Sequence, residues 1–111
     1  MQTATKVTRT DCLVARLGDR APAADLEIVG YEVHLPEGTD AGPHRHAYST
    51  VARVLDGVFR YQIGEGPAKD YTAGEVFSEP AGVVVSGRAL APTTLYVVLV
   101  RQPGEPEARP A

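Results

Sequence analysis

Hydrophobic and polar residues alternate over many short stretches of this chain, and a turn sequence follows nearly every stretch. Alternation with a period of two is typical of β-strands that bury one face. It predicts strands over residues 12–17, 25–35, 47–55, 58–63, 70–72, 75–78, 83–90 and 94–101. No stretch keeps helical periodicity for more than a turn or two. We therefore expect an all-β domain.

Glycine and proline mark the turns between these strands. Residues 36–43 are predicted to be a loop. Asp56-Gly57 is a strong two-residue hairpin signal, so residues 58–63 should pair back on the preceding strand. Many short strands with regular turns indicate a sandwich or barrel. The length and the turn residues favour a small jelly roll of two sheets, whose interior can hold a ligand.

The chain has 111 residues, 43% of them hydrophobic, which fits one domain with a modest core. Residues 11–101 are expected to form the barrel. Residues 1–10 are predicted to be a leader or an exchanged edge strand, and residues 102–111 a flexible Pro-rich tail.

Charge and cysteine usage narrow the environment and the partners. The net charge is −3 without a basic cluster, which argues against nucleic acid or an anionic membrane as the main partner. Cys12 is the single cysteine, so no internal disulfide can form and a reducing compartment is the default. No apolar run could span a bilayer, and the start lacks the apolar core of a secretory signal. We expect a cytoplasmic protein.

The candidate chemistry starts at His44 and His46, which follow a Gly/Pro-rich loop. Side chains at i and i+2 of a strand point to the same face, so the two imidazoles should converge. Two convergent imidazoles form half of a metal site or the core of a polar pocket.

The spacing around these histidines forms two motifs that together span residues 38–89. The first runs from Gly38 over five residues to His44-Arg45-His46, then over three to Thr50 and six to Gly57. The second runs from Gly74 over five residues to Pro80-Ala81-Gly82, then over two to Val85 and three to Ala89. This spacing resembles the cupin family, in which Glu, His and Asn stand where this chain has Thr50, Val85 and Ala89. The chain also resembles small bacterial cupins that carry a Glu just before Pro-x-Gly, here Glu79.

The resemblance implies an all-β, single-domain cupin double-stranded β-helix, that is, a jelly-roll barrel. It also implies a homodimer, paired through edge strands, with the N-terminal residues as a candidate for exchange. In metal-binding cupins the positions of His44, His46, Thr50 and Val85 hold iron, manganese, zinc or nickel. Here Thr50 is a poor ligand and Val85 cannot ligate, so the cofactor is either none or one weakly bound divalent metal. Glu79 could complete a set of two histidines and one carboxylate.

The alternative is a metal-free pocket in which His44, His46 and Glu79 are catalytic groups that move a proton. Such a set suits an isomerase, cyclase or lyase and does not suit oxygen activation. It requires Glu79 to face inward, and the sequence leaves open whether this side chain faces the pocket or water. The substrate-binding residues would be Tyr48, Thr50, Tyr61 and Val85.

Val85 makes one wall of the expected pocket apolar, so a partly apolar small molecule is the expected substrate. Our leading hypothesis is therefore a small-molecule enzyme of the isomerase, cyclase or lyase type. A metal-dependent cupin oxygenase or related metalloenzyme, with a reduced ligand set, is the second hypothesis. The third is a non-catalytic cupin that binds a small ligand.

Overall fold

The computed structural model of the chain describes residues 6–16 and 25–111. Strands, turns and bends make up these two ranges, and no helix that could cross a membrane occurs in them. The strands are β1 (Thr8–Arg16), β2 (Glu27–Leu35), β3 (Asp40–Arg45), β4 (Thr50–Asp56), β5 (Val58–Ile63), β6 (Lys69–Thr72), β7 (Val76–Glu79), β8 (Val85–Ala89), β9 (Thr93–Arg101) and β10 (Arg109–Pro110). The expectation of an all-β chain is confirmed.

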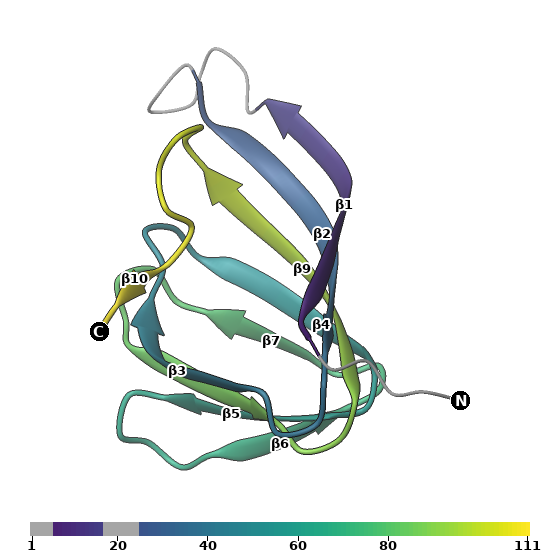
Figure 1. Ribbon diagram of the computed structural model, residues 1–111. Coiled ribbons are helices and arrows are strands. Elements are labelled where there is room, and N and C mark those ends of the chain that lie inside the picture. The colour runs from purple at the N-terminus through teal and green to yellow at the C-terminus, as the bar shows by residue number, and fades with distance from the viewer. Residues whose placement is uncertain (1–5, 17–24) are drawn as a thin grey trace.

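The strands form two antiparallel sheets of five strands each. The first sheet has the order β1-β2-β9-β4-β7, and the second has the order β10-β3-β8-β5-β6. Figure 1 shows the first sheet at the upper right and the second at the lower left, folded over one another. From β3 to β9 the chain passes from one sheet to the other at every step except between β5 and β6. This is the jelly-roll barrel that the motif spacing implies.

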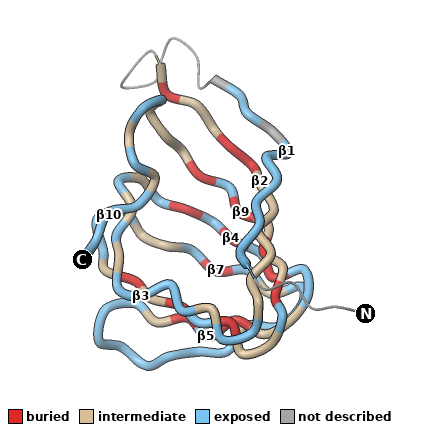
Figure 2. The backbone as a smooth tube through the Cα atoms, in the orientation of Figure 1, coloured by how far each residue is buried: buried red, intermediate tan, exposed pale blue. Residues whose placement is uncertain are grey.

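The core lies between the sheets and follows the period-two pattern of the sequence. In β4 the buried residues Thr50, Ala52 and Val54 alternate with exposed ones, and β8 and β9 alternate in the same way. Figure 2 shows buried stretches on the central strands, whereas the edge strand β1 is largely exposed. Burying one face of each sheet supplies the main favourable free energy of this fold.

An aromatic cluster fills one part of the core. The rings of Phe59 and Phe77 stack with centroids 5.5 Å apart, and Tyr61 packs on Phe77 at 4.5 Å. Gly87 makes room for this cluster, because a Cβ atom there would lie 2.2 Å from Cζ of Phe59. The glycine in β8 therefore allows the close approach of an aromatic ring to the backbone.

The hairpin predicted at Asp56-Gly57 is wrong. β4 pairs with β7 and β9, whereas β5 pairs with β6 and β8 in the other sheet. Gly57, with a φ of 94°, turns the chain at this corner between the sheets. A Cβ atom at Gly57 would lie 2.4 Å from the carbonyl oxygen of Pro92, so the corner is packed tightly against the start of β9. Asp-Gly favours a left-handed turn in either setting, and the tertiary contacts decide which strands it joins.

The loop predicted over residues 36–43 ends earlier than expected, because β3 begins at Asp40. Pro43 lies where the register of β3 against β8 shifts, between Ala41 and His44. Proline cannot donate a ladder hydrogen bond and is tolerated in a sheet at such irregularities.

The two ends of the chain also take part in the sheets. β1 begins at Thr8 and pairs with β2 of the same chain, so residues 8–10 of the predicted leader form part of an edge strand. Residues 1–5 and 17–24, which include half of that leader, lie outside the described residues. Within the segment expected to be a flexible tail, Arg109 and Pro110 form β10, which pairs with β3.

Candidate functional site

The two histidines of the first motif lie side by side at the end of β3. His44 belongs to β3, and His46 follows its last residue. Their ring centroids are 5.1 Å apart, with the rings nearly perpendicular at 80°. Both residues are partly buried. The predicted convergence of the two imidazoles is therefore present in the structure.

Backbone carbonyls fix the orientation of both rings. Nδ1 of His44 lies 2.8 Å from the carbonyl oxygen of Gly42, and Nδ1 of His46 lies 2.8 Å from that of Glu107. A carbonyl oxygen can only accept, so each Nδ1 carries the proton and donates it. The neutral form of each ring then has its lone pair on Nε2. This is the tautomer that a metal-binding or proton-accepting histidine needs.

The Glu79 carboxylate faces these rings from the other sheet. Glu79 is the last residue of β7 and stands directly opposite Thr50 of β4, whose side chain is buried. Side chains of directly opposed residues share a face, so Glu79 points into the barrel. Its side chain is 15% exposed, and a carboxylate oxygen contacts Nε2 of His46. This answers the question that the sequence leaves open about Glu79.

The contact between His46 and Glu79 has an electrostatic consequence. Two acceptors, a nitrogen lone pair and a carboxylate, would repel each other unless a proton or another cation lies between them. The Glu79 carboxylate accordingly raises the pKa of His46 above its ordinary value. Burial of the ring opposes this rise, and the Glu107 carbonyl adds to it. The pair is thus built to hold a cation or a proton at one point.

The donor set also fits a divalent transition metal. One ligand atom from each of His44, His46 and Glu79 lies within 4.8 Å of the other two. Nε2 of His46 is buried and has no well-formed hydrogen-bond partner in the described part of the chain. Two imidazole nitrogens and one carboxylate oxygen are ligands that iron, manganese, zinc and nickel accept. The three residues predicted to be catalytic therefore also form a possible metal site.

The two positions that depart from the cupin motifs border the same site. Thr50 is 1% exposed and lies opposite Glu79, and Val85 is 1% exposed and lies opposite His44 in the pairing of β3 with β8. The carboxylate that Thr50 lacks is thus supplied by its cross-strand neighbour. His44, His46 and Glu79 do not replace the ligand nitrogen that a histidine would supply at position 85, so this wall of the site is apolar.

The two tyrosines predicted to bind substrate differ in their surroundings. Tyr61 packs in the aromatic cluster, and its hydroxyl donates to the Ser78 carbonyl at 2.9 Å. Burial, with the nearby charge of Glu79, raises the pKa of Tyr61 well above its ordinary value, so the hydroxyl stays protonated. Tyr48 is partly buried and borders a cavity of about 10 Å³ together with Glu105 and Glu107.

The sequence reasoning missed the residues that hold the site from the C-terminal side. The Glu107 carboxylate accepts from Arg9 at 2.5 and 3.1 Å and from Arg101 at 3.1 Å. The Arg9 guanidinium lies 3.7 Å from the ring centre of Tyr31. Arg9 foremost, with Arg101, holds the pKa of the Glu107 carboxyl below its ordinary value. No periodicity could reveal these contacts, because Arg9 and Glu107 are 98 residues apart in sequence and Arg101 and Glu107 do not lie on a common strand.

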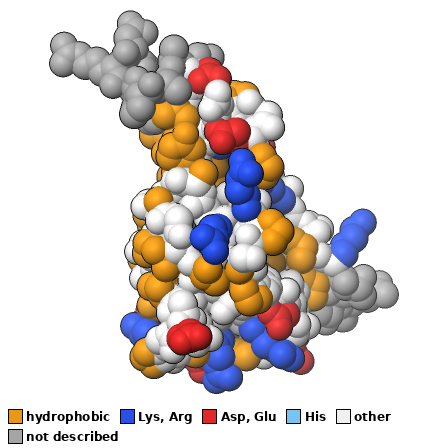
Figure 3. Space-filling view, turned by 90° about the vertical axis from the view of Figure 1, so that its left-hand side faces the viewer, with side chains coloured by type: hydrophobic (Ala, Val, Ile, Leu, Met, Phe, Trp, Pro, Cys, Tyr) orange, Lys and Arg blue, Asp and Glu red, His pale blue; other side chains and the backbone are white. Residues whose placement is uncertain are grey.

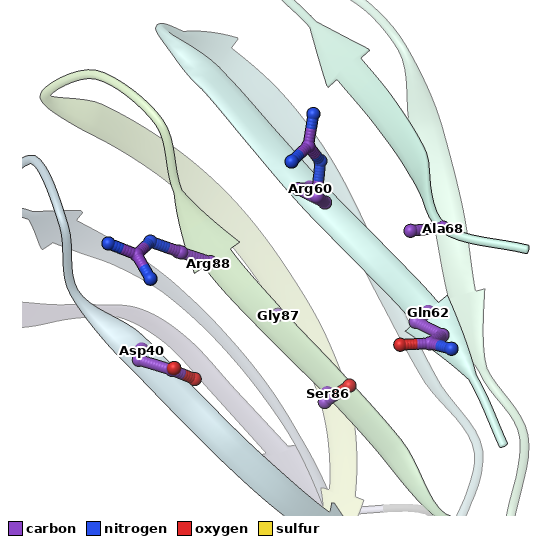
Figure 4. Close-up of a pocket in the computed structure, with 7 residues that line it drawn as sticks. All are labelled: Asp40, Arg60, Gln62, Ala68, Ser86, Gly87 and Arg88. Atoms are coloured by element: carbon purple, nitrogen blue, oxygen red, sulfur yellow. The ribbon is translucent and has the colours of Figure 1, made fainter. Parts of the chain in front are cut away.

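Besides a cavity of about 200 Å³ bordered by Tyr61, Lys69 and Tyr71, two more cavities lie away from the histidines. One of about 170 Å³ lies on the second sheet, where Arg60 and Arg88 stand directly opposite each other. Figure 4 shows their guanidinium groups pointing apart, so they do not converge on a shared anion. The other, of about 400 Å³, is bordered by His34, whose Nδ1 lies 2.9 Å from Oγ1 of Thr94. Neither of these two cavities brings together two imidazoles and a carboxylate, as the site at His46 does.

Comparison with solved structures supports the fold. The structure of KdgF from Halomonas sp. superposes with a TM-score of 0.65 at 21% identity, over 92% of this chain and 84% of that one. A structure described as the DMSP lyases RdDddP and RnDddQII gives 0.64 at 21% identity, over 76% and 44%. Salicylate 1,2-dioxygenase from Pseudaminobacter salicylatoxidans gives 0.60 at 19% identity, over 71% of this chain and 26% of that one.

The comparison of sequences identifies the family. No protein of curated function matches this chain. The family described as "Cupin domain" matches residues 31–100, which is more than half of the chain and includes both motifs. Together with the two-sheet barrel and the paired histidines at the end of β3, this match shows that the chain belongs to the cupin family.

Proposed function

We propose that this cupin is a small-molecule enzyme that moves a proton at the pair formed by His46 and Glu79, as an isomerase, cyclase or lyase. The contact between Nε2 of His46 and the Glu79 carboxylate carries the proposal. The carbonyl of Glu107 holds Nδ1, so the exchangeable proton of the pair lies on the side of Glu79. Such a pair can take a proton from a carbon of the substrate and return it to another atom.

The surroundings of the pair support a partly apolar substrate. Val85 lies opposite His44, and Phe77 precedes Glu79 by two residues on β7, with its side chain in the core. Apolar walls with a few convergent polar groups are the usual form of a small-molecule site. A molecule with a carbonyl beside an aromatic or aliphatic part would match both features.

His44, His46 and Glu79 are also the residues that would hold a divalent metal in this cupin. A bound metal would supply a Lewis acid that polarises a carbonyl oxygen of the substrate. With or without a metal, the residues around the site have the same roles. The carbonyls of Gly42 and Glu107 orient the imidazoles, and the apolar wall at Val85 limits access of water.

A metal-dependent oxygenase or related metalloenzyme is the second candidate. The buried Nε2 of His46, which faces the Glu79 carboxylate, favours it, together with the nitrogen, nitrogen and oxygen donors of the site. The neighbours described as DMSP lyases and as a salicylate dioxygenase indicate that this fold hosts both kinds of chemistry. The metal content therefore separates the two candidates better than the fold does.

Solvent deuterium exchange tests the leading proposal. We would incubate the protein in D₂O with a panel of aromatic and polyketide-like carbonyl compounds and follow deuterium at the carbon beside the carbonyl by NMR. Wild-type protein should catalyse exchange, and Glu79→Gln or His46→Asn should slow it by at least about 100-fold. Glu75→Gln, an exposed acid on the turn before β7, is the matched control and should exchange like wild type.

The same variants distinguish the rivals. Equal exchange in wild type, His46→Asn and Glu79→Gln would end the catalytic assignment. Saturable binding of a panel compound without exchange would favour the non-catalytic cupin. Stoichiometric iron, manganese, zinc or nickel that is lost on substitution of His44 or His46 would favour the metalloenzyme.

The environment and assembly of the chain stay predictions. We propose a cytoplasmic protein, from its single cysteine. We also propose a homodimer, as the cupin resemblance implies. β1 lies at the edge of the first sheet and pairs there with β2, so its outer edge could extend the sheet into a second copy. Sedimentation equilibrium of the full chain would show a dimer mass if this pairing occurs.

A further inference from the structure

The last three residues of the chain lie against the strand that carries His44. Arg109 and Pro110 form β10, opposite Arg45 and His44 of β3, and the Ala111 amide donates to the Pro43 carbonyl at 3.3 Å. Figure 1 shows β10 and the C-terminus beside β3, at the left of the barrel. Figure 3, which looks from that side, shows acidic and basic side chains close together among hydrophobic ones. The C-terminal segment 102–111 therefore docks at the candidate site.

Glu107 joins this segment to both sheets. Its backbone carbonyl accepts from Nδ1 of His46, beyond the end of β3. Its carboxylate binds Arg9 through two hydrogen bonds and Arg101 through a third, and these arginines lie on β1 and β9. Arg9 is held in turn by the face of Tyr31 and by Asp11. The carbonyl that sets the tautomer of His46 is thus held in place by ion pairs of its own side chain.

The same segment leaves little space beside Tyr48. Glu105, Pro106 and Glu107 border the cavity there, whose volume of about 10 Å³ is room for one water molecule. Oε1 of Glu105 is buried in this region without a hydrogen-bond partner among the described residues. An organic molecule could enter between Tyr48 and the segment only if the segment moved.

We propose that Glu107 is a positioning residue and that the C-terminal segment 102–111 is a cover whose docking sets the tautomer of His46. This inference rests on the proposed function, since it assigns a role to the same site. Undocking would open the space beside Tyr48 and free Nδ1 of His46 from the Glu107 carbonyl. The imidazole could then exchange its two neutral tautomers, and Nε2 would no longer be held as the lone-pair atom that faces Glu79. Docking of the segment would therefore change together with the ability of His46 and Glu79 to bind a cation or move a proton.

The test compares two variants of the full chain that each remove the carboxylate of a bidentate arginine pair. Glu107→Ala breaks the pair with Arg9 at the cover. Asp70→Ala breaks the pair between Arg60 and Asp70, at 2.8 and 3.1 Å on the second sheet, and is the matched control. Nitrogen chemical shifts of the imidazoles report the tautomer of His46 without any metal. Hydrogen exchange of the Ala111 amide reports docking, and Co²⁺ titration reports the affinity of the centre.

We expect Glu107→Ala to move the His46 nitrogen shifts toward the average of two tautomers. It should speed exchange of the Ala111 amide at least about tenfold and weaken Co²⁺ binding about 10- to 100-fold, the usual cost of losing a partner of a ligand histidine. Asp70→Ala should leave all three unchanged. If Glu107→Ala fails to fold, Glu107→Gln keeps the shape of the side chain and should give the same changes in smaller measure.

Unchanged His46 shifts and unchanged Ala111 exchange in a folded Glu107 variant would overturn the inference. This result does not depend on whether the proposed function is correct. A wild-type protein that binds no Co²⁺ and catalyses no deuterium exchange would remove the proposed function, whereas the tautomer and amide measurements would still decide whether docking positions His46.

Discussion

Val85 stands directly opposite His44 in the pairing of β3 with β8. In the other sheet, the pairing of β4 with β7 places Glu79 directly opposite Thr50. The two departures from the cupin motifs thus have different outcomes. At Thr50 the missing carboxylate is provided across the strand pair, whereas at Val85 the missing imidazole leaves an apolar wall. The centre keeps two nitrogens and one oxygen, and its fourth side is hydrophobic.

Restoring a histidine at position 85 should strengthen metal binding. The Val85→His side chain would project from the residue opposite His44, within reach of the same centre. Because Val85 is 1% exposed, the larger ring should cost about 1–3 kcal/mol of stability without metal. Added Zn²⁺ should return more stability to Val85→His than to wild type. Thermal unfolding with and without Zn²⁺ measures both effects.

Val85→Leu is the control for this variant, since it adds bulk without a ligand atom. It should lose stability and gain nothing from Zn²⁺ beyond the wild-type response. An equal response to Zn²⁺ in Val85→His and Val85→Leu would mean that position 85 does not face the histidines as the pairing indicates.

Removing the charge of Glu79 should weaken the centre for any cation. Glu79→Gln keeps the size of the side chain but leaves a neutral amide beside Nε2 of His46. We expect Co²⁺ affinity to fall at least about tenfold, because a carboxylate ligand is lost. Isothermal titration measures the change. Glu75→Gln, whose carboxylate caps Thr72 instead, should bind Co²⁺ like wild type, and a similar loss there would point to a general effect of net charge.

The sequence alone predicts the features that depend on the spacing of residues along one strand. The two-residue interval between His44 and His46 predicts their convergence, and the alternation in residues 94–101 predicts a strand that the structure extends by one residue to Thr93. Motif spacing then implies the fold as a whole. Each of these inferences uses geometry within one strand or a resemblance over the whole domain.

Features that depend on contacts between distant residues could not be predicted in this way. Asp56-Gly57 has the local preferences of a hairpin, yet the packing of Gly57 against Pro92 makes it a corner between sheets. Residues 102–111 have the composition of a mobile tail, yet Glu107 meets two arginines from separate strands. Ion pairs of this kind do not follow a periodic pattern in the sequence, so a three-dimensional structure is needed to find them.

Stability should fall at alkaline pH through Tyr31. Burial raises the pKa of Tyr31 from 10.0 to about 12, although Arg9 opposes the rise. A group whose pKa is higher in the folded state favours folding fully below its unfolded pKa and loses that contribution as pH rises through the folded value. The loss should therefore fall between pH 10 and about 12 and reach about 2 kcal/mol. Urea unfolding across this range should show it, and Tyr31→Phe should flatten the slope. A slope unchanged in Tyr31→Phe would assign the loss to other groups.

Gly87→Ala should be one of the most damaging small substitutions in the chain. The added Cβ would lie 2.2 Å from Cζ and 2.6 Å from Cε2 of Phe59, so the ring or the strand must shift. Phe59 is itself packed on Phe77, which limits its movement. We expect a loss of about 1–3 kcal/mol in urea unfolding.

Two further variants of the same kind decide whether the clash with Phe59 is the cause. Gly42→Ala meets no atom within 4 Å and should cost much less, even though Gly42 also lies in a strand of the second sheet. Phe59→Leu removes the ring atoms that the new methyl would strike. The double variant should therefore lose less stability than the sum of the two single losses, because contacting residues couple. Additive losses would show that Gly87→Ala acts through the β8 backbone instead of through the aromatic cluster.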